Sequence, residues 1–423
     1  MSLFVNPLVV VKRISAALAL ALLIGSAVAA AETPFAGTPA PTPLPALRVG
    51  TSGDYRPFSF RNAEGTLSGF DVAVAEQLAL YLGRRLELVP FRWPELASQL
   101  QAGAFDIAMS GVTVRPERAL QVVFSRPYAF TGAVAVIRTG DRSKFGALDD
   151  LDRPDVRIVV NAGGHLEQVA RHRFHRAHIA PLPDNAALPT MLLSGTADVA
   201  ISEELEARTW PTTELVALGP FTHDRKAYAV RRDDAELLRR VNAWLTAREG
   251  DGWLNARRRQ WFGAQTLLTP QRAGFAALVT AMDLRLQLMP FVAAVKRREH
   301  LPIHDPAQEA RVLAHVREEA TAEHLNADDV AAFFRVQMDA AKAVEEHAPA
   351  VTSHASLADV RSAITSVTDE IIAELARCAP WLREPPLRDQ LDHMLRQELT
   401  AAGLTAQTID ALARATCTVR MAR

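Results

Sequence analysis

The chain has 423 residues, more than one ordinary hydrophobic core accommodates, so we expect two folded domains. Hydrophobic residues make up 49% and charged residues 22%, a balance typical of soluble globular proteins. The formal net charge of −1 argues against a general binder of nucleic acid or membrane surfaces, because such proteins carry an excess of basic residues.

The first residues have the parts of a secretion signal. Lys12 and Arg13 precede the apolar run Ile14–Ile24, and small residues at Ala27–Ala31 suit a signal peptidase. The uncharged stretch spans about seventeen residues, which is short for a membrane anchor, and no later segment is predicted to span a bilayer. We predict that residues 1–31 are a signal peptide and that the mature protein is periplasmic, with no membrane partner after cleavage.

After a Pro-rich linker at 32–45, strand and helix patterns alternate as far as the helix at 235–247. This alternation predicts a parallel α/β sheet. Beyond Phe262 only helical patterns follow, and Thr405 or one of its neighbours is placed to cap the last helix. These helices are expected at 275–298, 306–324, 327–347, 357–376, 386–402 and 406–416. We therefore predict an α/β domain at 46–262, a linker at 263–273 and an all-helical domain at 274–423.

The chain has two cysteines, Cys378 and Cys417, both in the predicted helical domain. Disulfides persist in the compartment to which a signal peptide leads. One disulfide between these two residues is therefore the natural pairing.

Several motifs of the α/β domain occur in a characteristic order: GDYRPFSF (53–60), FDIAMSGVTVRPER (105–118), NAGG (161–164) and ADVAISEELEAR (197–208). Together they resemble the amino-acid-binding family of periplasmic solute-binding proteins, whose two lobes close on a ligand. The resemblance covers about 215 residues. It implies that Ser110, Thr113 and Arg118 hold a ligand carboxylate, a role that suits the planar guanidinium fork.

The same motifs, with RWPEL and KAYAV, resemble a narrower group, the cyclohexadienyl dehydratases. These enzymes convert prephenate to phenylpyruvate and often arogenate to phenylalanine. In the binding proteins an acidic residue at the position of Glu203 contacts the ligand ammonium. In the dehydratases a glutamate three residues later is the general acid, which corresponds to Glu206. Because an acid that protonates a leaving hydroxide must hold its proton near neutral pH, we predict a raised pKa for Glu206.

The resemblance implies further substrate-binding residues in the cleft: Tyr55, Trp93, Asn161, Gly164, His165 and Lys226. Lys226 is expected to balance a second negative charge, and Tyr55 and Trp93 to enclose the ring, although each also suits ordinary packing. The free N–H groups of the helix that opens at His165 suit an anion. This sequence departs from the group at His165, where threonine is usual, and at Glu203, where the dehydratases tend to carry aspartate.

The helical domain has a spacing of basic and acidic residues that places several on one side of a bundle. Arg285 and Lys296 are eleven residues apart, about three helical turns, so they lie on one face. The pattern R-x₁₀-K-x₈-D, which ends at Asp305, resembles the all-helical chorismate mutases, specifically the secreted subclass with a C-terminal disulfide. The match covers about 145 residues.

Chorismate mutase rearranges chorismate to prephenate without a covalent step or a metal, by clamping a dicarboxylate and stabilising charge on its ether oxygen. The resemblance implies carboxylate binding by Arg285 and Arg361 and donation to the ether oxygen by Lys296 and Glu345. A glutamate donates only when protonated, so this step weakens as pH rises. The resemblance also implies that Asp305 and Glu309 orient the lysine and the substrate hydroxyl, and that Gln308 stands at a substrate-binding position.

Two positions depart from the mutases: Gln308 replaces an arginine, and Ala341 a serine or threonine. Losing an arginine from a site that clamps charged groups costs several kcal/mol of binding energy unless another residue replaces it. These departures therefore leave open the alternative that the helical domain is degenerate and purely structural.

The product of one reaction is the substrate of the other, so we predict a bifunctional enzyme of phenylalanine synthesis that takes chorismate to prephenate and on to phenylpyruvate. We expect small-molecule substrates, no cofactor or metal, no nucleic-acid partner and a homo-oligomer. The main alternative is an amino-acid receptor for a transporter, with the helices serving for dimerisation. A sensor input domain is disfavoured because it needs a transmembrane helix.

Overall fold

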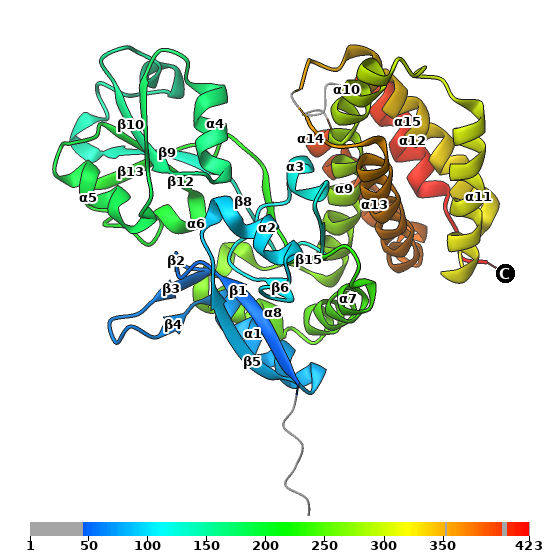
Figure 1. The fold of residues 1–423 in the computed structure, drawn as a ribbon, viewed down its shortest axis with the longest axis horizontal. Helices are drawn as coiled ribbons and strands as arrows, with labels where there is room; N and C mark the ends of the chain where they lie inside the picture. Colours follow the sequence, from blue (N-terminus) through cyan, green and yellow to red (C-terminus); the bar gives the residue numbers. More distant parts are fainter. Residues whose placement is uncertain (1–44, 352, 400–403, 423) are drawn as a thin grey trace, which may run out of the picture. The chain divides into compact units, whose positions relative to one another are not determined.

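A computed structural model describes residues 45–351, 353–399 and 404–422. The predicted signal peptide and almost all of the Pro-rich linker lie outside these residues. The α/β part contains two five-stranded sheets, and a helical part follows it in the chain (Figure 1).

The first sheet has the strand order β5-β1-β6-β15-β7. β1 pairs in parallel with β5 and β6, whereas β15 runs antiparallel to β6 and β7. Its strands are β1 (Ala46–Thr51), β5 (Arg85–Pro90), β6 (Ile107–Ala108), β7 (Val122–Phe124) and β15 (Ala229–Arg231). The accompanying helices are α1 (Phe70–Leu82), α2 (Leu96–Gln101), α3 (Pro116–Ala119), α7 (Ala235–Gly250) and α8 (Trp253–Trp261). A small meander of β2 (Asp54–Tyr55), β3 (Ser59–Arg61) and β4 (Leu67–Ser68) follows β1.

The second sheet has the order β11-β10-β12-β9-β13, again with a parallel centre and an antiparallel strand, β9. Its strands are β9 (Ala133–Arg138), β10 (Arg157–Asn161), β11 (His178–Leu182), β12 (Val199–Glu203) and β13 (Leu215–Leu218). Both sheets therefore contain parallel and antiparallel strand pairs. The predicted parallel arrangement is wrong for β15 in the first sheet and for β9 in the second. β8 (Ala129–Thr131) and β14 (Asp224–Lys226) form a separate antiparallel pair.

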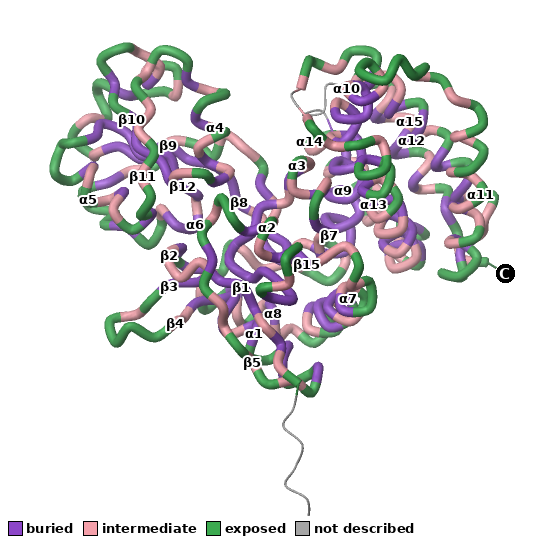
Figure 2. The backbone as a smooth tube through the Cα atoms, in the orientation of Figure 1, coloured by how far each residue is buried: buried purple, intermediate pink, exposed green. Residues whose placement is uncertain are grey.

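Alternation along β9 explains why the second sheet is covered on both faces. Ala133, Ala135 and Ile137 join one buried cluster with Leu166 of α4 (His165–Arg173). The intervening valines join another with Leu188 of α5 (Leu188–Leu193). Successive strand side chains point to opposite faces, so a strand that is apolar throughout needs a helix on each side. Figure 2 shows β9, β10 and β12 as largely buried.

The helical part has one apolar core. Its elements are α9 (Pro270–Gln287), α10 (Met289–Glu299), α11 (Pro306–Ala322), α12 (Ala327–His347), α13 (Leu357–Cys378), α14 (Pro385–Leu399) and α15 (Ala406–Thr418). α12 has the predicted bounds. The Thr405 side chain accepts a hydrogen bond from the Thr408 amide, so the predicted N-cap of α15 is confirmed.

Three expectations for the helical part need correction. α9 begins at Pro270, inside the predicted linker. The predicted single helix at 275–298 is interrupted at Leu288, because Pro290 lacks the amide hydrogen that a continuous helix would use there. The expectation that no segment after the signal peptide could span a bilayer is wrong by length and composition, because Pro270–Glu299 is long and apolar enough. However, 83% of its most apolar window is buried inside the protein, as in the core helix of a soluble protein.

The predicted disulfide is not formed, and both cysteines are free thiols. Cys378 is buried at the end of α13, where its sulfur lies beside Gly274 of α9. Cys417 is half-buried on α15, where the charged neighbours that act on it are on α14. The two thiols therefore have different neighbours, on α9 for Cys378 and on α14 for Cys417.

Candidate active sites

A cavity in the α/β part is lined by residues that follow strand ends of both sheets. Asn161 ends β10 and Glu203 ends β12, while Thr113 follows β6. Ligands of open α/β sheets bind outside the carboxyl ends of parallel strands, and this cavity fits that rule. Its lining contains most of the predicted cleft residues: Tyr55, Trp93, Thr113, Arg118, Asn161, Gly164, His165 and Glu203.

Arg118 is the cationic side chain on this cavity wall. Its Nη1 donates to the Thr113 carbonyl at 3.0 Å, and its guanidinium lies 5.9 Å from the Trp93 ring centroid. Burial lowers the pKa of Arg118 to about 10, so it remains charged at neutral pH. Trp93 also meets Tyr55 edge-on at 5.6 Å, which makes an aromatic wall next to the guanidinium.

Ser110 does not line the cavity, contrary to prediction. It is fully buried, and its hydroxyl accepts a hydrogen bond from the Ser52 amide at 3.1 Å and lies 2.9 Å from the Ser52 hydroxyl. The Ser110 hydroxyl is therefore hydrogen-bonded to Ser52, and this contact holds the loop that carries Thr113.

Lys226 is buried and paired within the protein. Its Nζ lies 2.5 Å from Glu203 Oε1 and donates to Thr113 Oγ1 at 2.7 Å and Tyr55 Oη at 3.4 Å. Burial raises the pKa of Glu203 to about 7, although Lys226 opposes the shift. The second Glu203 oxygen has no hydrogen bond with the described residues. The acidic residue of this cleft thus already has an ammonium partner.

Glu206 lies on the short helix α6 (Glu204–Ala207), directly behind the cavity wall. Ser202 donates to its Oε2 at 2.7 Å, and Asn185, which lines the cavity, donates to its Oε1. Burial raises the pKa of Glu206 to about 8, and the nearby charges of Glu203 and Asp54 add to the rise. Glu206 is therefore mostly protonated at neutral pH, as predicted, but it reaches the cavity through Asn185.

His165 opens α4, and its Nε2 lies 2.9 Å from Oδ2 of Asp224 of β14. Burial lowers the pKa of His165 despite this carboxylate, so the imidazole is neutral at pH 7. Glycine is required nearby at Gly111, where φ is +64° and a Cβ atom would lie 2.8 Å from Phe58 and Tyr55.

A second cavity, of about 600 Å³, lies within the helical part. All predicted mutase positions line it, which confirms that their spacing brings them together: Arg285, Lys296, Asp305, Gln308, Glu309, Ala341, Glu345 and Arg361. They come from α9, α10, the start of α11, α12 and α13. The remaining wall is mostly apolar, with Met289, Val292 and Met338 among its members.

Lys296 and Glu345 form an ion pair at 2.7 Å, and Lys296 also donates to the Ile303 carbonyl at 3.0 Å. Burial raises the pKa of Glu345, although Lys296 opposes the shift. Burial lowers the pKa of Arg285 to about 10, and its Nε has no hydrogen bond with the described residues. Among the described residues Arg285 forms no ion pair, and a buried guanidinium without a carboxylate partner that faces a cavity suits an anionic ligand.

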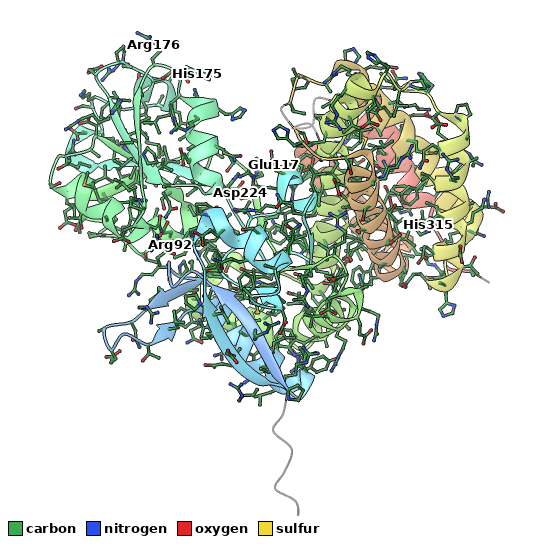
Figure 3. All side chains as sticks on the ribbon, in the orientation of Figure 1. Arg92, Glu117, His175, Arg176, Asp224 and His315 are labelled. Atoms are coloured by element: carbon green, nitrogen blue, oxygen red, sulfur yellow. The ribbon has the colours of Figure 1, made fainter. Side chains whose placement is uncertain are left out.

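One predicted role differs from the geometry. Asp305 caps α11 by accepting from the Gln308 amide at 3.0 Å and does not orient Lys296. Glu309 contacts Lys342 at 3.4 Å. A further wall residue is His315 of α11, which is labelled in Figure 3. Its Nε2 lies 2.7 Å from Oδ1 of Asp369 of α13.

The residues that sequence analysis missed in the first cavity are Gly111, Leu166 and Asn185. Asn185 comes shortly after β11, just as Asn161 comes at the end of β10. The rule that ligands bind at the carboxyl ends of parallel strands could therefore have indicated Asn185. In the second cavity the missed charged residues are Arg311 and Lys342, which lie within one helical turn of predicted ones.

Two sheets with a cavity at their strand ends define a two-lobed ligand-binding protein, here followed by a helical domain with its own cavity. Residues 47–264 match bacterial extracellular solute-binding proteins, family 3, and residues 276–346 match chorismate mutase type II. The chain belongs to family 3 of the bacterial extracellular solute-binding proteins and carries a chorismate mutase type II domain behind it.

Similar proteins include enzymes and receptors. The cyclohexadienyl dehydratase of Pseudomonas aeruginosa is 39% identical over 220 residues, 51% of this chain and 82% of that protein. The L-cystine-binding protein TcyJ of Escherichia coli is 30% identical over 222 residues, 52% of this chain and 83% of that protein. The ancestral amino acid-binding protein AncCDT-1, described as a precursor of cyclohexadienyl dehydratase, has a TM-score of 0.50 and 37% identity, covering 51% of this chain and 95% of that one.

Proposed function

We propose that this protein is a bifunctional enzyme of phenylalanine synthesis. The helical domain converts chorismate to prephenate, and the two-lobed domain converts prephenate to phenylpyruvate. The observation that carries the second assignment is the buried, protonated Glu206 behind the cleft wall. The similarity to a cyclohexadienyl dehydratase and the match to chorismate mutase type II support two consecutive reactions.

In the helical cavity the chemistry needs positioning and charge stabilisation. Arg285 and Arg361 hold the two carboxylates and keep the substrate in its folded conformer. As the carbon–oxygen bond breaks and the new carbon–carbon bond forms, negative charge grows on the ether oxygen. Lys296 donates to that oxygen, and Glu345, 2.7 Å from Lys296, adds a second donation only in its protonated form.

In the cleft, prephenate loses carbon dioxide and its ring hydroxyl, and the ring becomes aromatic. Arg118 binds a carboxylate while Tyr55 and Trp93 enclose the ring. Glu206 lies behind Asn185, so it supplies a proton to the departing hydroxyl through one water, and the hydroxyl leaves as water. Electrons of the breaking carboxyl bond enter the ring. Asn185 and Ser202 hold the Glu206 carboxyl in place through its two oxygens.

The rival function is a receptor for free amino acids. Such a receptor needs an acidic residue available to the ligand ammonium, but Glu203 is paired with Lys226 at 2.5 Å. It also has no use for the second buried carboxyl at Glu206. The cleft therefore suits prephenate, which has no ammonium, better than an amino acid, and by the same reasoning better than arogenate.

Variants of one site at a time test the proposal. Glu206→Gln should convert chorismate to prephenate and stop there. Lys296→Met should fail with chorismate and still convert prephenate supplied directly. If wild type consumes neither substrate but binds an amino acid in calorimetry, the receptor function is correct and the proposal is wrong.

We further propose that the mature chain is periplasmic and forms a homo-oligomer. Family membership supports export, because the family is described as extracellular. N-terminal sequencing of protein from a periplasmic fraction tests cleavage after residue 31, and light scattering tests self-association. A retained N-terminus or a monomer mass contradicts the corresponding part.

A further inference from the structure

The helical cavity contains a guanidinium that the proposed mechanism does not use. Arg311 lies on α11 and lines the cavity with Gln308 and Glu309. The Gln308 side-chain oxygen accepts hydrogen bonds from Nε of Arg311 at 3.1 Å and from Nη2 at 2.8 Å. These bonds fix the plane of the guanidinium and leave its Nη1 side available to a ligand.

Helix geometry explains why Arg311 reaches the position of Gln308. Side chains on a helix lean toward its N-terminus, so a residue covers the turn before its own Cα. Residues 308 and 311 are three apart and therefore neighbours on the helix surface. The guanidinium of Arg311 thus lies over the turn that carries Gln308, where the mutase resemblance implies an arginine.

The charges of the cavity favour a doubly negative ligand. Five lining side chains are cationic and three are acidic: Arg285, Lys296, Arg311, Lys342 and Arg361 against Asp305, Glu309 and Glu345. Lys296 pairs with Glu345, and Lys342 with Glu309. Within the described part of the chain, the three arginines form no ion pair. By contrast Arg317, further along α11, pairs with Asp328 at 2.5 Å.

We propose that Arg311 binds a carboxylate of the dicarboxylate substrate and that Gln308 is its positioning residue. The arginine is therefore shifted by three residues along α11, while its guanidinium stays beside residue 308. This inference rests on the proposed mutase function and identifies a third arginine of its substrate site.

Steady-state kinetics of the full chain with chorismate test this role. Arg311→Ala should raise KM and lower kcat/KM by about tenfold to a hundredfold, the loss of one charge-assisted contact. Arg317→Ala is the matched control, because it removes an arginine from the same helix outside the cavity. The double variant Gln308→Arg/Arg311→Ala should recover most of kcat/KM, which a purely structural role of Arg311 would not produce.

Conversion of prephenate by each variant reports whether the chain is folded, because that reaction uses the other domain. If Arg311→Ala keeps normal prephenate turnover and matches Arg317→Ala within twofold on chorismate, the inference is overturned while the mutase function stands. If wild type itself leaves chorismate unchanged, the proposed mutase function falls and this inference with it.

Discussion

Replacing Glu206 by glutamine removes the proton that the proposed dehydration needs and preserves the shape of the side chain. With a pKa of about 8, about nine-tenths of the wild-type carboxyl is protonated at pH 7. A carboxyl at the ordinary value of 4.5 would be protonated in only about 0.3% of molecules, so burial increases the competent fraction about 300-fold. General acids contribute about 10² to 10⁴ in rate, and we expect Glu206→Gln to lose that much kcat with prephenate.

The assay is phenylpyruvate formation from prephenate across a pH series. Because the proton is lost as pH rises through the Glu206 pKa, wild-type kcat should fall above about pH 8. The residual activity of Glu206→Gln should lack that decline. Glu204→Gln is the matched control, since Glu204 is the neighbouring glutamate on α6 and pairs with Arg208 near the surface. A Glu206→Gln variant within threefold of wild type would refute the reasoning.

Three further predictions follow from individual contacts. Ser202→Ala removes a hydrogen bond that lowers the pKa of Glu206, so the decline of prephenate turnover should move to higher pH; an unchanged profile would contradict this. Chorismate rearrangement should slow as pH rises through the raised pKa of Glu345, and Glu345→Gln, which keeps a donor, should flatten the profile; the reverse trend would contradict it. Denatured, unreduced protein should titrate two thiols per chain, because Cys378 and Cys417 are unbonded; no reactive thiol would restore the disulfide predicted from sequence.

Much of the helical site was predictable because helical spacing maps directly onto space. The R-x₁₀-K pattern predicted that Arg285 and Lys296 lie on one face, and both line the cavity although they come from two helices, α9 and α10. The predicted bounds of α12 match the structure, in which the Asn326 side chain caps the helix. The interruption of the helix at Leu288 was not predicted, because the apolar pattern continues across it.

The cleft was less predictable because its contacts join distant segments. The alternation of strands and helices indicates sheets but does not encode strand direction, which is why β9 and β15 were missed as antiparallel strands. The pairing of Lys226 with Glu203 depends on β14 and β12 meeting at the cavity. Asn185 lies in a short turn with no motif, and only its place after β11 connects it to Glu206.

The central claim, that one chain performs both steps, is tested most directly by a time course with chorismate as the only substrate. Purified mature protein should consume chorismate, pass through prephenate and accumulate phenylpyruvate. Prephenate that accumulates without phenylpyruvate would contradict the dehydratase function of the cleft, and unchanged chorismate would contradict the mutase function of the helical domain.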